Sequence, residues 1–232
     1  MEYRVEKKYL VTDMELAVIA RRLGAVMEQD SNQYGDCYEI RSIYFDDDKN
    51  SCMDEIETGV DLRSKYRIRT YGANASPINL EIKEKKNGYT KKRVCSISND
   101  EYNEIIAGKM QFLYDDRKPL NQFLLKSKVS NLRPKIIITY ERTAFIHTSG
   151  NVRITFDRCI RASRSINSFF DEKVEGNIPV LPSGVNILEV KYDEFLPDII
   201  AEQLEIGKLR QTAFSKYYLG RMAVNGDFYT TV

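Results

Sequence analysis

The sequence contains no tryptophan and a single histidine, His147, and its four cysteines form no CxxC pair. Because the cysteines are widely spaced, neither a zinc finger nor an HExxH metalloprotease site fits the sequence. One histidine also leaves no credible Ser/His or Cys/His catalytic pair. We therefore interpret the cysteines as reduced, buried thiols and His147 as a structural residue.

The motifs GxxxxGK[ST], GxGxxG and GxSxG are absent, which excludes P-loop, Rossmann and α/β-hydrolase sites. No apolar run approaches the 18 residues of a membrane-spanning helix, and residues 1–4 lack an apolar signal core. These absences predict a cytoplasmic protein with no membrane segment. The 35 Lys and Arg residues nearly balance the 34 Asp and Glu residues, which argues against a nucleic-acid partner.

Helix signals are present but sparse. Capping boxes at Thr12–Glu15 and Ser98–Glu101 predict two helices, the first running to about Glu28. Further helices are predicted to begin at Pro119 and Pro197, and a last one covers residues 214–224.

Between the helices, most segments alternate apolar and polar residues with period two, as β-strands do. Asn87-Gly88 and Gly150-Asn151 mark hairpins between such segments. There is no internal repeat or linker, so we predict one α+β domain over residues 1–232, built on an antiparallel sheet.

One face of the predicted strands is charged, because residues two apart on a strand share a face. Its cations are Arg4, Lys8, Lys65, Arg67, Arg69, Lys83, Lys85, Arg142, Arg153 and Lys191. Its acids are Glu6, Glu81, Asp157 and Glu189. A single amphipathic strand is usually solvent-exposed on its polar side, but the repetition over five or six strands favours an enclosed charged surface.

Curling such a sheet with its charged face inward predicts a closed β-barrel with a cationic lumen and flanking helices. Like charges held close together need an anionic occupant, and Arg and Lys both bind phosphate oxygens. Triphosphate and polyphosphate, with a divalent cation, are therefore the predicted ligands. Metal-assisted phosphoryl transfer also needs no covalent side-chain nucleophile.

The hairpin around Asn87 adds a dense group of cations. They are Lys85, Lys86, Lys91, Lys92 and Arg93. They either guide a long anion to the mouth of the barrel or form an ordinary solvated turn.

Eight segments follow one another in a characteristic order. They are Val5–Tyr9, Ser42–Asp46, Lys65–Gly72, Leu80–Lys83, Tyr140–Phe145, Val152–Asp157, Leu188–Lys191 and Phe214–Tyr217. Each is weak alone, but the ordered set resembles the VTC domain of polyphosphate polymerases, within the wider CYTH or triphosphate-tunnel superfamily. The resemblance covers essentially the whole chain.

The resemblance implies an eight-stranded antiparallel tunnel that transfers the terminal phosphate of ATP to a polyphosphate chain with Mn²⁺ or Mg²⁺. Its implied partners are ATP or another nucleoside triphosphate, and polyphosphate or pyrophosphate. Its implied phosphate-contacting and catalytic residues are Lys8, Arg67, Arg69, Lys83, Arg142 and Lys216, together with Tyr140. It implies Glu189 as the metal ligand, although the residue pattern alone also allows a counter-ion. The charged face and the hairpin add Arg153, Lys191 and Lys92 as predicted substrate-binding residues.

Three functions stay open at this point: a polyphosphate polymerase, a triphosphate hydrolase or cyclase of the tunnel superfamily, and a non-catalytic polyphosphate sensor. Tunnel hydrolases generally begin with ExExK, whereas here Arg4 replaces the first carboxylate, which weakens a two-metal hydrolysis. The polymerases often carry a second basic residue one turn before the FSK lysine. Here that position is Ala213, and Arg210 is predicted to replace it from the same helical face.

Overall fold

The computed structural model describes residues 4–31, 33, 35–72, 76–87, 89–111, 116–205 and 209–227. Its strands are β1 (Val5–Thr12), β2 (Glu28–Gln29), β3 (Tyr38–Asp46), β4 (Arg63–Tyr71), β5 (Ile78–Lys86), β6 (Tyr89–Ile97), β7 (Arg133–His147), β8 (Val152–Ser163), β9 (Ile178–Pro179), β10 (Val185–Tyr192) and β11 (Arg210–Gln211). Its α-helices are α1 (Asp13–Leu23), α2 (Ser51–Glu57), α3 (Asn99–Ala107), α4 (Lys118–Ser130), α5 (Asp198–Gln203) and α6 (Lys216–Asn225).

The strands form one 11-stranded antiparallel sheet that does not close into a barrel. Its main path is β11-β1-β10-β8-β7-β3-β4-β5-β6, and β2 and β9 pair with β7 and β8 beside it. The predicted closed eight-stranded barrel is therefore wrong. Within the described residues, the only backbone pairing between the β1 side and the β6 side of this path is an isolated bridge between Arg4 and Thr90.

The failure to close has a local cause at β1. The outer edge of this strand is occupied by β11, which pairs with Tyr9 and Leu10, and the backbone N–H of Thr212 donates to the carbonyl of Lys8. Toward β6, the one backbone pairing within the described residues comes from Arg4, just before β1. The period-two pattern determines which face of a strand is charged, but it carries no information about which edges pair.

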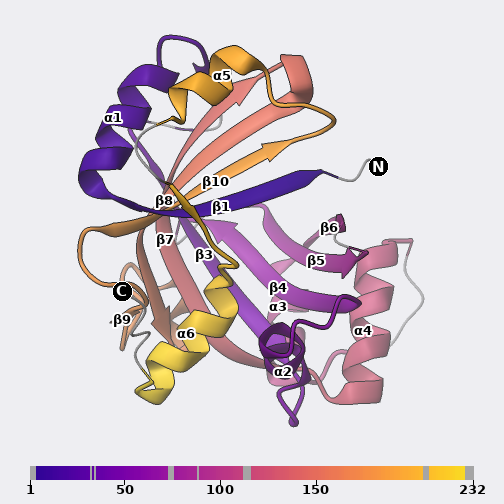
Figure 1. The fold of residues 1–232 in the computed structure, drawn as a ribbon. Helices are drawn as coiled ribbons and strands as arrows, with labels where there is room; N and C mark the ends of the chain where they lie inside the picture. The colour runs from indigo at the N-terminus through magenta and orange to yellow at the C-terminus, as the bar shows by residue number, and fades with distance from the viewer. Residues whose placement is uncertain are drawn as a thin grey trace.

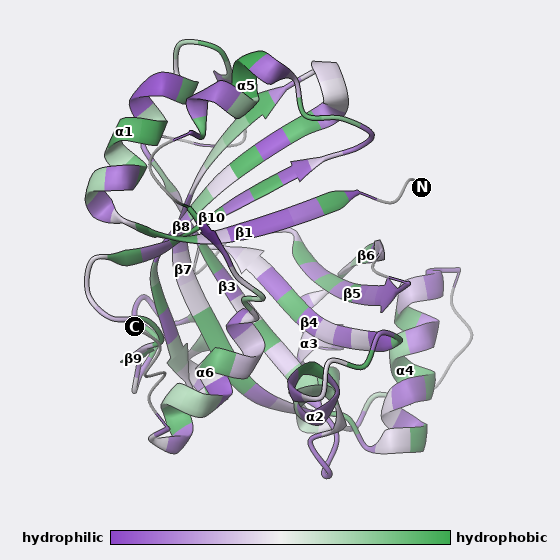
Figure 2. Cartoon of the chain, in the orientation of Figure 1, coloured by the Kyte–Doolittle hydropathy of each residue, from purple (hydrophilic) through white to green (hydrophobic). Residues whose placement is uncertain are grey.

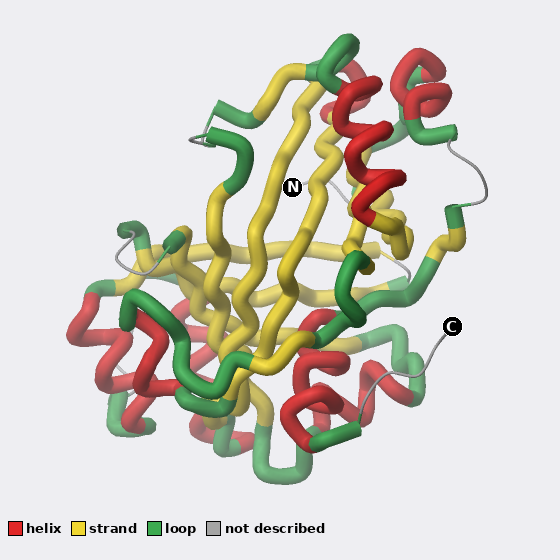
Figure 3. The backbone as a smooth tube through the Cα atoms, turned by 90° about the vertical axis from the view of Figure 1, so that its left-hand side faces the viewer, coloured by secondary structure: helices red, strands yellow, loops and turns green. Residues whose placement is uncertain are grey.

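The helices gather at two ends of the molecule, with the strands running between them (Figures 1 and 3). At one end, α1 and α5 cover an apolar cluster that includes Ile19, Phe156 and Leu188. At the other end, α2, α3 and α4 cover a larger cluster that contains Phe45 and Phe123. Bands of opposite hydropathy alternate along the strands between the helices (Figure 2), as expected for a sheet with one polar face.

Helix α6 packs on the same face of the sheet as the charged residues. The ring of Tyr217 stacks on that of Tyr44 at 5.4 Å. Gly220 allows this close approach, because a Cβ atom there would lie 2.3 Å from Cδ1 of Ile138. The charged face is thus covered at one end by a helix.

The local predictions are largely confirmed. Both capping boxes form, at Thr12 and at Ser98, although α1 ends at Leu23, earlier than predicted. Helices α4, α5 and α6 begin near the predicted residues. Strands β5 and β6 flank Asn87 as predicted, while Gly88 lies outside the described residues.

A charged cavity as the candidate functional site

The charged face of the sheet lines a small polar cavity of about 90 Å³. Its lining residues are Lys8, Tyr44, Lys65, Arg67, Arg69, Lys83, Tyr140, Arg142, Glu189, Lys191, Phe214, Ser215, Lys216 and Tyr217. Eight of these are cations and one is an acid. Three further acids, Glu6, Glu81 and Asp157, form ion pairs with the lining cations. Cations therefore exceed carboxylates by four at this site.

Asp157 on β8 is the most deeply buried carboxylate of the site. The guanidinium of Arg142 donates to both of its oxygens, at 2.6 and 2.8 Å, and Nζ of Lys216 lies 2.5 Å from Oδ2. Burial alone would raise the pKa of Asp157, but Arg142 and Lys216 outweigh it and bring the pKa to about 2. The carboxylate is thus ionised at neutral pH and fixes both cations.

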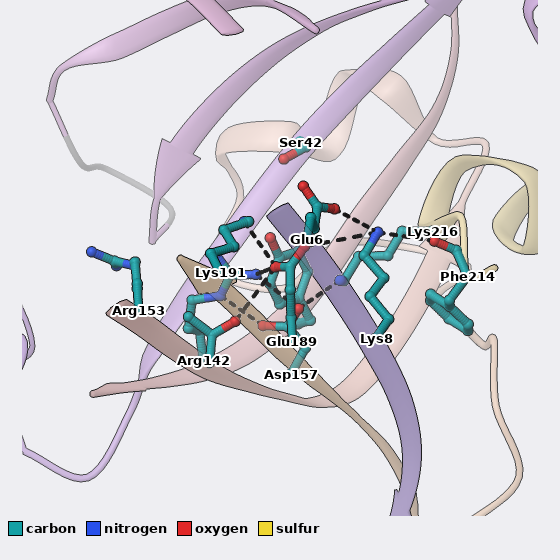
Figure 4. A network of polar contacts seen from close by, with 12 residues as sticks. Glu6, Lys8, Ser42, Arg142, Arg153, Asp157, Glu189, Lys191, Phe214 and Lys216 are labelled. Carbon is teal, nitrogen blue, oxygen red and sulfur yellow. Dashed lines mark hydrogen bonds and ion pairs between the residues drawn. The ribbon is translucent and has the colours of Figure 1, made fainter. Parts of the chain in front are cut away.

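Glu189 on β10 faces the same end of the cavity (Figure 4). Its Oε2 lies 3.0 Å from Nζ of Lys191 and 3.6 Å from Nη2 of Arg142, and its Oε1 lies 3.8 Å from Nζ of Lys8. Burial raises the pKa of Glu189, but Lys191 and Lys8 outweigh burial and hold this pKa well below its usual range. We call Arg142, Asp157, Glu189 and Lys216 the deep cluster.

At the β1–β5 side, Glu6 forms an ion pair that spans two strands not adjacent in the sheet. Nζ of Lys83 on β5 lies 2.8 Å from Oε2 of Glu6 on β1. Burial lowers the pKa of Lys83 to about 8, because nearby Lys8 and Lys191 add to burial and Glu6 offsets them only in part. Lys83 is therefore a cavity cation that loses its charge as pH rises through about 8.

Glu81 on β5 organises the two arginines of β4. Its Oε2 lies 2.5 Å from Nη2 of Arg67 and 3.9 Å from Nη1 of Arg69, and its Oε1 lies 2.6 Å from Nζ of Lys92. The carboxylate is almost fully buried. Burial would raise its pKa, but these three cations hold the pKa well below the usual range. We call Glu6, Glu81, Lys83 and Lys92 the seam cluster.

Tyrosines complete the orientation of the arginines. Arg67 donates to the hydroxyl of Tyr44 at 3.0 Å, and Arg69 donates to that of Tyr140 at 3.1 Å. Nε of Arg69 donates to Oγ of Ser42 at 3.1 Å. A guanidinium held in this way presents its planar fork without losing side-chain entropy on binding.

Lys65 differs from the other cavity lysines because its hydrogen bond goes to an uncharged hydroxyl. Its Nζ donates to Oγ of Ser215, the N-cap of α6, at 3.1 Å. Burial, followed by the charges of Lys8 and Lys83, lowers the pKa of Lys65 well below its ordinary value. An anion between Lys65 and the start of α6 would relieve this repulsion.

The structure brings together most of the predicted site residues. All six predicted catalytic residues line the cavity, as do Tyr140, Lys191 and Glu189. Arg153 does not, because Nη1 pairs with Asp30 at 2.6 Å. Lys92 also lies outside the lining and reaches the site only through Glu81.

The prediction that Arg210 replaces the basic residue missing at position 213, from the same helical face, is wrong. Arg210 lies on β11 and α6 begins only at Lys216, so these residues share no helical face. Sequence reasoning also gave no site role to Glu81, Asp157, Lys65 or Tyr44. The first three had already been placed on the charged face, and only their contacts in the folded protein reveal their roles.

No group of three or more His, Cys, Asp and Glu side chains in the described ranges is arranged to hold a metal ion. Glu189 is the carboxylate that lines the cavity itself, and its ion-pair partners are Lys8, Arg142 and Lys191. Any metal here would therefore take most of its ligands from a bound phosphate compound or from water.

The sequence matches the model of the VTC domain over residues 3–225. The chain belongs to the VTC domain family. Among curated proteins, none matches this VTC domain in sequence. None of its helices in the described ranges is both long and apolar enough to span a bilayer.

Solved structures share the fold at low identity. A protein from Vibrio parahaemolyticus, described as a "putative adenylate cyclase", aligns with a TM-score of 0.55 and 9% identity over 94% of this chain and 97% of its own. A Bacillus halodurans protein with the same description gives 0.50 and 14%, over 88% and 87%. A Pyrococcus horikoshii protein gives 0.50 and 12%, over 93% and 98%. At these identities the likeness establishes the fold alone.

Proposed function

We propose that this VTC domain is a polyphosphate polymerase, which transfers the terminal phosphate of ATP to a polyphosphate chain inside the charged cavity. The observation that carries this proposal is the convergence of eight cations on one cavity, from six separate strands or helices. Carboxylates compensate only half of them. Phosphate compounds supply the missing negative charge in a form that Arg and Lys bind well.

The cations divide into groups suited to different phosphates. Arg67 and Arg69 lie on one strand, are oriented by Glu81, and can each clasp two phosphate oxygens. Arg142 and Lys216 form a second group around Asp157. We assign the triphosphate to the space between these two groups, so that charge developing on the transferred phosphoryl group meets cations on both sides.

The reaction needs no side-chain nucleophile or base. A terminal oxygen of polyphosphate is already anionic near neutral pH, because the second pKa of a terminal phosphate lies near 6. This oxygen forms a bond to the γ-phosphorus as the bond between that phosphorus and the bridging oxygen of ADP breaks. ADP leaves with the electron pair, which Lys and Arg side chains stabilise.

Glu189 is the residue that we propose as the metal ligand. Mg²⁺ and Mn²⁺ prefer hard oxygen ligands and usually bind through one or two carboxylates plus phosphate oxygens, which Glu189 and a triphosphate supply. When bound, such an ion would neutralise charge on the phosphates. In the ligand-free cavity Lys8 and Lys191 hold the carboxylate in place.

A hydrolase or cyclase is the second candidate, since two structures of this fold are described as adenylate cyclases of unproven activity. The position of Arg4 favours the polymerase over a two-metal hydrolase. Arg4 stands where tunnel hydrolases carry their first carboxylate, and its Nε pairs with Asp193 at 2.9 Å. It supplies no metal ligand.

The deciding experiment is incubation with ATP and Mn²⁺, followed by analysis of all products. ADP together with a phosphatase-sensitive polyanion ladder is the expected result. Free phosphate without a ladder would indicate a hydrolase, and a cyclic nucleotide would indicate a cyclase. Binding without any turnover would leave a polyphosphate sensor.

A further inference from the structure

The open side of the sheet lies between β1 and β6, and we call this opening the seam. From Lys8 onward the outer edge of β1 is paired with β11 and Thr212. Before Lys8, one bridge, between Arg4 and Thr90, is the only strand pairing across the seam within the described residues. A continuous backbone ladder therefore does not enclose the cavity on this side.

The charged side chains on the seam side are more exposed than those around Asp157. Lys92 and Lys83 are 44% and 31% exposed, whereas Lys216 and Arg142 are 10% and 9% exposed and Asp157 is fully buried. Solvent thus reaches the β5–β6 side of the charged face more easily than the β7–β8 side.

The far end of the cavity is covered by α6 and the residues before it. Phe214 and Tyr217 line the cavity and are both buried, and Tyr217 stacks on Tyr44. The carbonyl of Phe214 also accepts a hydrogen bond from Nζ of Lys8 at 3.0 Å. A long chain would have to displace this packed segment to pass straight through the cavity.

One ion pair holds the seam from inside. Glu6 on β1 contacts Lys83 on β5 through both carboxylate oxygens, at 2.8 and 3.0 Å. Lys83 is also one of the proposed phosphate-binding residues. A phosphate that takes Lys83 displaces the Glu6 carboxylate, since the ammonium has few donors and the two anions repel each other. Ligand binding therefore releases the tie between β1 and β5.

We propose that polyphosphate enters this cavity sideways across the seam, by displacing Glu6 from Lys83, and does not thread an end through a closed ring. The inference rests on the proposed polyphosphate-binding function. It assigns Glu6 as a latch and the segment from Arg4 to Lys7 as the movable side of the opening. Internal stretches of a long chain can then bind as well as its ends.

The first test compares three probes by calorimetry: tripolyphosphate, long-chain polyphosphate, and the same polymer with both terminal phosphates coupled to a bulky protein. The unmodified domain should bind the blocked polymer within about threefold of the unblocked one. If the unblocked polymer binds and the blocked polymer does not, the chain threads and the seam proposal is wrong. If neither polymer nor tripolyphosphate binds, the proposed function itself fails.

A second test closes the seam covalently. Arg4 and Thr90 are paired across antiparallel strands, where Cα atoms lie about 4.5–5.5 Å apart, a spacing that a disulfide can bridge. The oxidised Arg4→Cys/Thr90→Cys variant should bind tripolyphosphate normally and lose at least about tenfold in affinity for the blocked polymer. Reduction of the same sample should restore binding. Unchanged affinity for the blocked polymer after stapling would overturn the proposal.

A third variant tests the latch without a new crosslink. Glu6→Gln removes the charge that competes for Lys83 and should raise the association rate of long-chain polyphosphate about threefold or more. Glu84→Gln, on the same strand as Lys83 but paired with Arg93, is the control and should leave the rate unchanged. An unchanged rate in Glu6→Gln would contradict the latch.

Discussion

The deep cluster and the seam cluster both combine carboxylates with cations, but they differ in burial and in what their carboxylates join. In the deep cluster, Asp157 is fully buried and joins Arg142 to Lys216. In the seam cluster, Glu6 joins strands on opposite sides of an opening, and its partner Lys83 is 31% exposed. The first arrangement fixes a geometry, whereas the second holds a boundary that a ligand can release. Charge pairs of similar length therefore serve different purposes in one cavity.

The largest expected effect is the loss of stability in Arg142→Ala, which tests whether the deep cluster is needed for the fold. Arg142→Ala leaves the buried carboxylate of Asp157 with Lys216 as its remaining close cation, and breaking such a pair costs about 3–5 kcal/mol of unfolding free energy. Arg93→Ala, which breaks the more exposed pair with Glu84, should cost only about 0.2–1 kcal/mol. Urea denaturation measures both. Equal losses would remove the distinction between buried and exposed pairs.

Glu189→Gln tests whether the deep cluster also performs chemistry. The variant should fold and bind tripolyphosphate without metal at least as tightly, because a repelling anion is gone. Turnover should fall about a hundredfold, equivalent to about 2.7 kcal/mol of activation free energy. ATP consumption across a Mn²⁺ titration measures this, with Glu141→Gln as control, because Glu141 pairs with Arg158 and does not line the cavity. Near-normal turnover with unchanged metal dependence would leave Glu189 as a counter-ion.

Arg69→Ala tests the link between the two clusters. Arg69 contacts Glu81 of the seam cluster and Tyr140, whose ring lies under Arg142 and Lys216 of the deep cluster. Loss of a charged hydrogen bond should weaken triphosphate binding by about 1.5–3 kcal/mol. Arg69→Lys should recover only part of this, since lysine lacks the planar fork. Calorimetry with tripolyphosphate is the measurement. Identical affinities in all three proteins would mean that the ligand binds elsewhere.

The smallest expected effect is a pH dependence that arises at the seam. Lys83 has a pKa of about 8 in the folded protein, against an ordinary value of 10.5. It loses its charge as pH rises through 8, so tripolyphosphate affinity should fall a few-fold between pH 7 and about 9. Lys83→Met is the control, because ionisation of the ligand affects both proteins alike. Parallel pH profiles would exclude Lys83 as the cause.

As pH rises, the stability of the ligand-free protein should increase, whereas its affinity for tripolyphosphate falls. A lysine whose pKa is lower in the folded state binds its proton more readily when unfolded. Its contribution to the free energy of unfolding therefore increases as pH rises from about 8 toward 10.5. Thermal unfolding of the wild type and Lys83→Met across this range measures the difference, and no difference would contradict the lowered pKa.

Much of the site could be predicted because strand alternation is local. Arg67, Arg69 and Lys83 were placed on one face by period two alone, and all three line the cavity. Arg153 follows the same alternation, yet Asp30, far away in sequence, withdraws it from the cavity. Lys216 came from the family resemblance, because it lies at the start of a helix, where strand alternation does not apply.

The sequence by itself determined the caps, the hairpins and the charged face of each strand, since these depend on neighbours within a few residues. Only the tertiary structure decided that the sheet stays open, that α6 covers one end of the cavity, and that Glu81 and Asp157 orient its cations. Edge closure depends on the twist summed over the whole strand path and on where residues 209–212 return to β1. Such long-range terms leave no periodic trace in the sequence.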